Sequence, residues 1–231
     1  MKNNSCYGKD LEYCRTVVID KCFHENYHKD RSKLHDNILT SIFAYSGQPW
    51  SNIDEKGHIL LLTAGPMATG KSTIVSSLQR NNIIPFNRAP IVIDIDAIRM
   101  NLIMANGLSK LDAFTVGENT QKESGYVAEL AVFLALSKKE NGMNIQKSHV
   151  SIHGNNNGVT LVILDGSMRE IRWHRQYITT LRSMFPELRV FVIHITAARK
   201  TAIARNLLRA ETSLRGVPQH VLEDSFQVLY D

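Results

Sequence analysis

A glycine-rich segment directly after an apolar run is the feature of this sequence that most constrains its fold. Residues 58–64 form the run, which is typical of a buried strand, and residues 65–73 read Gly-Pro-Met-Ala-Thr-Gly-Lys-Ser-Thr. This segment satisfies the Walker A pattern, in which glycines let backbone N–H groups approach phosphate oxygens and the following helix points its positive end at them. Strand, loop and a helix at 71–80 predict an α/β fold of the P-loop NTPase class.

Each position of the segment has an expected task. We expect nucleotide binding by Gly65, Pro66, Met67, Ala68, Thr69, Gly70, Lys71, Ser72 and Thr73. In this pattern Lys71 reaches the β- and γ-phosphates, Ser72 ligates Mg²⁺, and Thr73 offers a hydroxyl near the α-phosphate. The predicted cofactors are therefore ATP or GTP with Mg²⁺. The structural alternative is a glycine-rich turn that only joins a strand to a helix.

Apolar runs alternate with helix-length segments through the rest of the chain. Further strands are predicted at 90–95, 160–164 and 188–195, and helices at 97–105, 118–139, 170–184 and 197–210. Near-continuous apolar strands between helices indicate a doubly wound, mostly parallel sheet with helices on both faces.

The segment before the first strand has a different pattern. Residues 9–46 carry apolar side chains at helical intervals, and the loop-forming run at 47–52 separates them from the first predicted strand. We therefore expect an N-terminal helical extension, residues 1–56, and a P-loop kinase domain, residues 57–231.

Composition limits the classes of function. With 43% hydrophobic and 21% charged residues the chain is typical of a soluble globular protein, and it lacks both an apolar leader and a membrane-length apolar stretch. A cytoplasmic location without membrane contact is the expectation. The net charge of +5 favours anionic partners, but the basic residues are spread out, which argues against a nucleic-acid interface. Three cysteines are expected to be reduced, and the spacing of Cys14, Cys22, His24 and His28 matches no usual zinc site.

Two predicted strands end in carboxylates. The carboxyl ends of strands face the ligand crevice in open α/β sheets, so Asp94 and Asp96 are expected near the transferred phosphate, where one can accept the proton of an attacking hydroxyl. The alternative is that an aspartate caps the next helix. Asp165, with Ser167 after it, ends the third strand, where it can order magnesium, bind substrate or cap a helix.

Arginines near the C-terminus precede a Gly-Val-Pro stop signal. Arg205 and Arg209 are four residues apart and share a helix face, and Arg215 comes next in a polar loop. Such arginines can neutralise the charge that spreads over a γ-phosphate, or they can form a solvated helix face. Three other conspicuous residues, His194, Trp173 and His174, are interpreted as core or packing residues.

Taken together, the motifs resemble those of the zeta toxin family of kinases. They are the Walker A segment, Ile-Asp-Ile-Asp-Ala-Ile-Arg at 93–99, Thr-Gln-Lys-Glu-Ser at 120–124, Asp-Gly-Ser-Met-Arg-Glu at 165–170 and Thr-x2-Arg-x-Val-Pro at 212–218. The match spans about residues 58–225. The resemblance implies phosphorylation of a hydroxyl group on a small molecule. In the best-known bacterial members of the family this substrate is UDP-N-acetylglucosamine.

The resemblance also assigns roles to residues. It implies that Asp96 is the base, that Lys71, Arg205 and Arg215 stabilise charge, and that the first of the two arginines is either Arg205 or Arg209. It places Glu123, Asp165 and Ser167 on the substrate side, and we expect Asp94, Arg99 and Arg169 to bind substrate as well. It further implies an antitoxin-like protein partner that covers the nucleotide site, a place that the N-terminal helices could take instead.

Two other functions remain open from the sequence. A 5′-hydroxyl polynucleotide kinase could use the same core with a basic groove. A nucleotide-binding interaction module without turnover could use residues 1–56 as a partner surface, although Lys71, Ser72 and Asp96 are all present.

Overall fold

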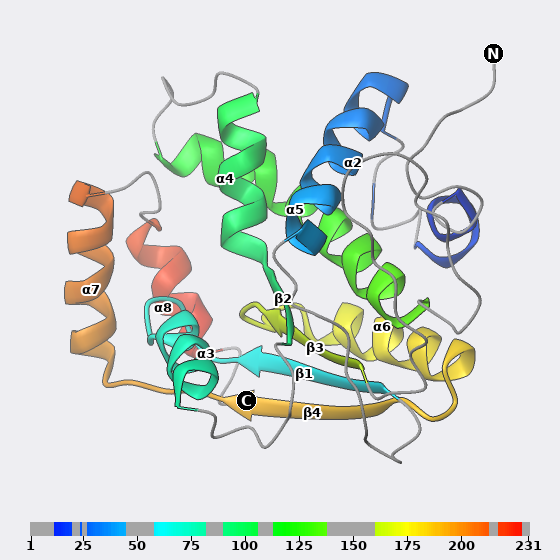
Figure 1. The fold of residues 1–231 in the computed structure, drawn as a ribbon. Helices are drawn as coiled ribbons and strands as arrows, with labels where there is room; N and C mark the ends of the chain where they lie inside the picture. Colours follow the sequence, from blue (N-terminus) through cyan, green and yellow to red (C-terminus); the bar gives the residue numbers. More distant parts are fainter. Residues whose placement is uncertain are drawn as a thin grey trace.

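The computed structural model describes residues 12–19, 24, 27–44, 58–81, 90–105, 113–137, 160–212 and 217–227. Its elements, in chain order, are η1 (Cys14–Val18), α2 (Lys29–Ala44), β1 (His58–Ala64), α3 (Lys71–Arg80), β2 (Ile91–Asp94), α4 (Ile95–Ala105), α5 (Ala113–Ser137), β3 (Thr160–Asp165), α6 (Ile171–Met184), β4 (Arg189–His194), α7 (Arg199–Thr212) and α8 (Gln219–Gln227). Figure 1 shows them arranged around one sheet.

The sheet has the order β2-β3-β1-β4, and its strand pairs are all parallel in the described part of the chain. The strand before the glycine-rich segment, β1, lies between β3 and β4. Because all carboxyl ends meet at one edge, the residues that come directly after β1, β2 and β3 lie together there. Asp94 and Asp165 are register partners at that edge.

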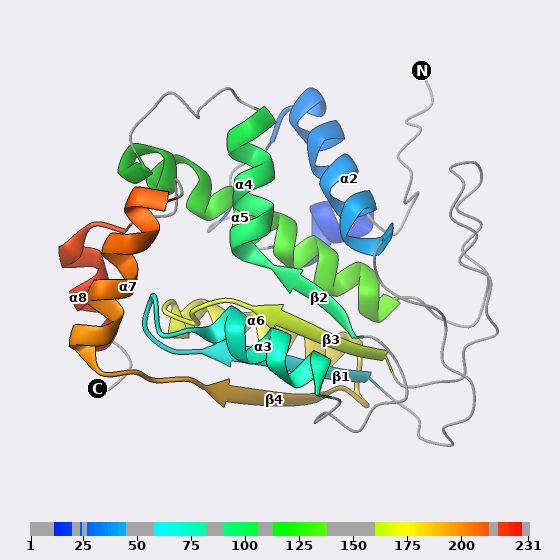
Figure 2. The ribbon, with the colours of Figure 1, turned by 60° about the vertical axis from the view of Figure 1, so that its left-hand side comes forward.

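Helices cover both faces of this sheet, which confirms the predicted fold class. Side chains alternate along β1, so that Leu60 and Leu62 join the core beneath α5 and α6, while Ile59 and Leu61 join a smaller cluster with Val75 of α3. Figure 2 shows α3 in front of the sheet and α6 behind it.

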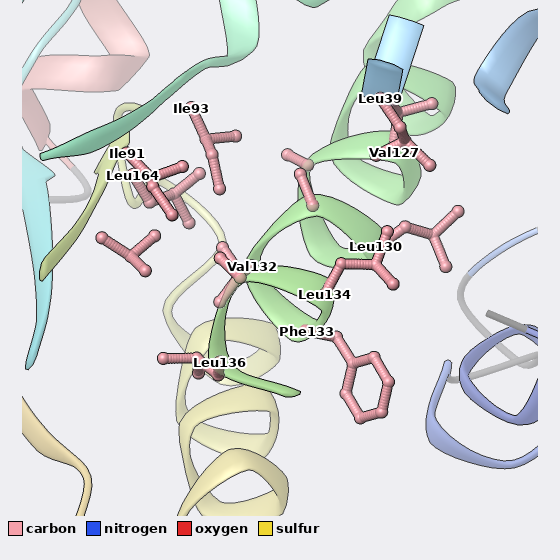
Figure 3. Close-up of a cluster of buried hydrophobic side chains, with 14 of the residues drawn as sticks. Leu39, Ile91, Ile93, Val127, Leu130, Val132, Phe133, Leu134, Leu136 and Leu164 are labelled. Atoms are coloured by element: carbon pink, nitrogen blue, oxygen red, sulfur yellow. The ribbon is translucent and has the colours of Figure 1, made fainter. Parts of the chain in front are cut away.

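The larger core centres on the second half of α5. Its residues from Tyr126 to Leu136 are all buried, as expected for a helix that is apolar on every side. Figure 3 shows their side chains against β2, β3 and the N-terminal helix α2, with labels on Leu39, Ile91, Ile93, Val127, Leu130, Val132, Phe133, Leu134, Leu136 and Leu164. Helix α2 therefore shares its core with the sheet domain.

Polar contacts also attach the N-terminal segment to α5. Arg31 and His35 of α2 both contact the Glu123 carboxylate, with 2.5 Å from Arg31 Nη2 to Oε2 and 2.6 Å from His35 Nε2 to Oε1. His24 makes a second buried pair with Glu129. Burial would raise the pKa of Glu123, but the hydrogen bonds from His35 and Arg31 outweigh it, so this pKa is lowered. Burial also lowers the pKa of His35, so a neutral ring donates its N–H to the carboxylate.

Glu123→Gln is expected to lower the free energy of unfolding by about 3 kcal/mol, because it leaves the partly buried Arg31 guanidinium without its carboxylate. Urea unfolding followed by circular dichroism measures this change. Lys33→Gln on the same helix is the matched control, since Lys33 pairs with Asp30 in solvent and should be indistinguishable from wild type. Equal stability of the Glu123 variant and the control would show that the α2–α5 contact is unimportant for folding.

Three features of the chain differ from the sequence predictions. Helix α4 starts at Ile95, because the Asp94 carboxylate caps it and ends β2 one residue early. Helix α8 was not predicted. The interpretation of His194 as a core residue is wrong, because β4 lies at the end of the described sheet and leaves this side chain exposed. Trp173 and His174 do pack against the core, as predicted.

Two other predictions fall partly outside the described residues. Cys6 and Cys22 lie outside them, whereas Cys14 is a buried free thiol whose pKa is raised by burial. The boundary at residues 56 and 57 also lies outside them and stays a prediction.

Among the helices that the structure describes, none combines the length and apolar character needed to cross a bilayer.

Candidate active site

The glycine-rich segment forms a tight loop between the ends of β1, β3 and β4. Gly65 has φ of +139°, and a Cβ on it would lie 2.0 Å from the carbonyl oxygen of Ile195, so no larger residue fits this position. Its N–H donates to the carbonyl of Ser167 at 3.3 Å. Gly70, also at positive φ, precedes the first residue of α3. The loop therefore places backbone at the N-terminus of a helix, which is an anion-binding arrangement.

Lys71 lies back across this loop. Its Nζ donates to the carbonyl oxygens of Gly65 at 3.0 Å and Pro66 at 2.7 Å. The pKa of Lys71 is lowered to about 8, chiefly by burial; Asp165 and Asp96 oppose this shift, and Arg209 adds to it. The charge of Lys71 is therefore sensitive to these three groups.

The two aspartates after β2 have different environments. Asp94 Oδ1 accepts hydrogen bonds from the backbone N–H groups of Asp96 at 2.8 Å and Ala97 at 3.1 Å, which is helix capping. The Asp96 carboxylate instead lies between two guanidinium groups, with 3.4 Å from Oδ1 to Arg99 and 3.1 Å from Oδ2 to Arg209. Asp94 is therefore engaged in capping the helix, whereas the partly exposed Asp96 carboxylate is the one of the two that can reach a reacting hydroxyl.

Asp165 lies at the end of β3, beside the loop. Its buried Oδ1 accepts a hydrogen bond of 2.8 Å from the hydroxyl of Thr63 on β1, and the backbone N–H of Gly166 donates to the same hydroxyl at 2.9 Å. Ser167 and Arg169 come next, in the turn before α6, and are half-buried. Thr63 was missed by the sequence analysis, although it is the polar residue in the apolar run of β1.

Helix α7 brings two arginines to this edge of the sheet. Arg205 Nη1 donates to the carbonyl of Thr69 in the loop at 3.1 Å, and Arg209 Nη2 donates to Asp96 at 3.1 Å. The sequence left open whether Arg205 or Arg209 is the first charge-stabilising arginine; both contact the site, and the assignment of this role stays a prediction. Arg215 lies outside the described residues, but Asn206 and Val217, on either side of it in the chain, are joined by two hydrogen bonds of 2.8 and 3.0 Å.

Helix α8 supports the loop from the side. The Ser225 hydroxyl accepts a hydrogen bond from the N–H of Met67 at 3.3 Å, and Leu222 packs against Ala68 and Ala202. The apolar spacing of Val221, Leu222 and Phe226 after a proline was the signal for this helix.

The described N-terminal residues lie away from the phosphate loop. Helix α2 contacts α4, α5 and β2, and Figure 2 shows it on the opposite side of α4 from α7 and α8. Glu123, which the sequence analysis expected on the substrate side, contacts Arg31 and His35 of α2.

The residues of this edge fit a nucleotide phosphate with Mg²⁺. Gly65 leaves room that a Cβ would fill, Lys71 lies at the loop, and Ser72 is exposed in the first turn of α3. Hydroxyl and carboxylate oxygens, which Ser72 and Asp165 supply, are the ligands that Mg²⁺ prefers.

Solved structures resemble this chain, among them the following two, whereas no protein-family model and no curated protein matches it. One is a chain of the PezAT chromosomal toxin–antitoxin system of the human pathogen Streptococcus pneumoniae, with a TM-score of 0.54 and 17% identity over 87% of this chain and 68% of that chain. The other, from the AvrRxo1-ORF1:AvrRxo1-ORF2 complex with sulphate ions, has a TM-score of 0.50 and 18% identity over 94% of this chain and 59% of that chain.

The chain has the fold of these two proteins. At identities of 17% and 18% the likeness establishes the fold alone. The chain spans about three fifths of the length of the second protein.

Proposed function

We propose that this protein is a Mg-ATP-dependent kinase of the zeta toxin family that phosphorylates a hydroxyl of a small molecule. The observation that carries the proposal is a set of contacts where the strands end: Lys71 and Arg205 donate to carbonyls of the phosphate loop, and Arg209 donates to the Asp96 carboxylate. A glycine-rich turn that only joins two elements requires neither a carboxylate nor arginines from a distant helix.

The described side chains can perform phosphate transfer in one step. The hydroxyl proton of the acceptor moves to the Asp96 carboxylate as the acceptor oxygen bonds to the γ-phosphorus, and the bond from that phosphorus to the leaving ADP oxygen breaks. Lys71 and Arg205, which contact the loop, neutralise charge on the phosphate oxygens. Ser72 and Asp165 would hold Mg²⁺, which would supply further neutralisation of the phosphate charge.

The acceptor is proposed to lie between Asp96 and the ends of β2 and β3. Arg99, Ser167 and Arg169 are proposed to bind the acceptor there. A sugar nucleotide such as UDP-N-acetylglucosamine, with its phosphate groups, suits such arginines. Arg215 is proposed as a further arginine of the site. Glu123 is proposed to contribute through its contact with α2.

A protein partner is also proposed. One structure with this fold comes from a toxin–antitoxin system. The described N-terminal residues pack on α5, whereas the phosphate loop contacts α7 and α8. An antitoxin-like partner at the nucleotide site therefore remains compatible with the position of α2.

A phosphate-transfer assay with a mixture of acceptors tests the proposed kinase function. Labelled γ-phosphate of ATP is supplied with Mg²⁺ to UDP-N-acetylglucosamine, nucleosides and short oligonucleotides, and GTP replaces ATP in a parallel arm. Label on the sugar nucleotide or a nucleoside supports the proposal. Salt-sensitive label on oligonucleotides would instead indicate a polynucleotide kinase. ATP binding without label on any acceptor would contradict the kinase proposal and favour a binding module.

A further inference from the structure

Helix α7 connects two parts of the site that are far apart in the sequence. One turn apart on this helix, Arg205 contacts the phosphate loop at Thr69 and Arg209 contacts the Asp96 carboxylate on α4. The two arginines share one face of α7, whereas Leu207 and Leu208 of the same helix are exposed to solvent. Figure 2 shows α7 standing beside α4, at the edge where the strands end.

The contact with Asp96 is built from two sides. Arg99 approaches Oδ1 from the same helix at 3.4 Å, and Arg209 approaches Oδ2 from α7 at 3.1 Å. The exposed fractions of the Asp96, Arg99 and Arg209 side chains lie between 27% and 35%. The carboxylate and its two partners are therefore accessible to solvent and to an acceptor rather than enclosed in a core. An i, i+3 contact within one helix leaves the carboxylate able to rotate, whereas a second contact from another element fixes its direction.

We propose that Arg209 is a positioning residue for the base Asp96: it orients the carboxylate toward the acceptor and couples its position to α7, while Arg205 serves the phosphate loop. This inference rests on the proposed kinase function. The division of work follows from the contacts, because Arg209 donates to the carboxylate and Arg205 to the loop carbonyl.

The test uses Arg209→Gln, Arg209→Lys, Asp96→Asn and the double variant Asp96→Asn/Arg209→Gln, assayed with Mg-ATP and the mixture of UDP-N-acetylglucosamine, nucleosides and oligonucleotides. Arg209→Gln is expected to lower the transfer rate about 10- to 100-fold. The ATP dissociation constant should change less than about threefold, because the phosphate loop is untouched. The acid limb of the pH–rate profile should move to higher pH, since a cation beside the carboxylate is lost. Arg209→Lys should recover part of the rate.

The double variant separates positioning from direct action on the phosphate. If Arg209 acts through Asp96, adding Arg209→Gln to Asp96→Asn lowers the remaining rate by less than about threefold. Lys200→Gln on the same helix is the control for a lost exposed cation and should match wild type.

The outcomes are distinguishable. An Arg209→Gln enzyme with the rate and pH profile of wild type would overturn the inference, as would an equal loss in the presence and absence of Asp96. Both results would leave the kinase function intact. A wild type that labels none of the acceptors would instead contradict the proposed function, and the inference with it.

Discussion

Asp96→Asn is expected to reduce phosphate transfer by about 10²- to 10⁴-fold, the range typical for loss of a general base. Its amide keeps the size of the side chain but cannot take the proton of the acceptor hydroxyl. The ATP dissociation constant should stay within about threefold of wild type, because the Asp96 carboxylate pairs with Arg99 on α4 and Arg209 on α7, neither of which belongs to the phosphate loop. Single-turnover transfer and equilibrium ATP binding measure the two quantities separately.

Asp224→Asn is the matched control for this prediction, since Asp224 is an exposed carboxylate on α8. It should retain wild-type transfer. Transfer at the wild-type rate by Asp96→Asn would exclude this carboxylate as the base. A parallel loss of ATP binding would place Asp96 in nucleotide binding instead.

Lys71→Met is expected to reduce transfer by about 10³-fold, the loss seen when a charge-stabilising donor is removed, and to weaken ATP binding as well. The Lys71 ammonium donates to two carbonyls of the loop and is therefore already placed where phosphate oxygens are expected. Arg80→Gln, an exposed cation at the other end of α3, is the control. A Lys71→Met protein that binds ATP and transfers phosphate like this control would show that the loop is only structural.

The lowered pKa of Lys71 adds a pH dependence to this prediction. With a pKa of about 8 in the protein before ATP is added, the side chain is charged below that pH and loses its proton above it. A bound phosphate favours the charged form, so binding takes up a proton above pH 8. ATP affinity should therefore fall as pH rises through 8, by up to about tenfold per pH unit. The fall should be absent in Lys71→Met.

Local patterns were sufficient to predict the phosphate loop and its surroundings. The Walker A spacing gave the bounds of α3, and the apolar runs placed all four described strands, because burial between helices demands such runs. The position of Asp94 and Asp165 side by side also follows from the rule that parallel strands end at one edge.

Long-range contacts were beyond the sequence patterns. Nothing in the spacing of Glu123 shows that Arg31 and His35, about 90 residues earlier, hold it. Likewise, Arg209 and Asp96 are 113 residues apart, and their contact depends on how α7 packs beside α4. His194 was misjudged because an apolar run does not reveal whether its strand lies at the centre or the end of a sheet.

The most direct test of the central claim is to follow ATP and Mg²⁺ with the acceptor mixture by ³¹P NMR, for wild type and Asp96→Asn side by side. Wild type is expected to form ADP and a phosphomonoester in equal amounts, whereas Asp96→Asn is expected to bind ATP but to form both about 10²- to 10⁴-fold more slowly. Wild-type protein that binds ATP and leaves it unchanged, or an Asp96→Asn variant that forms the phosphomonoester as fast as wild type, would contradict the central claim.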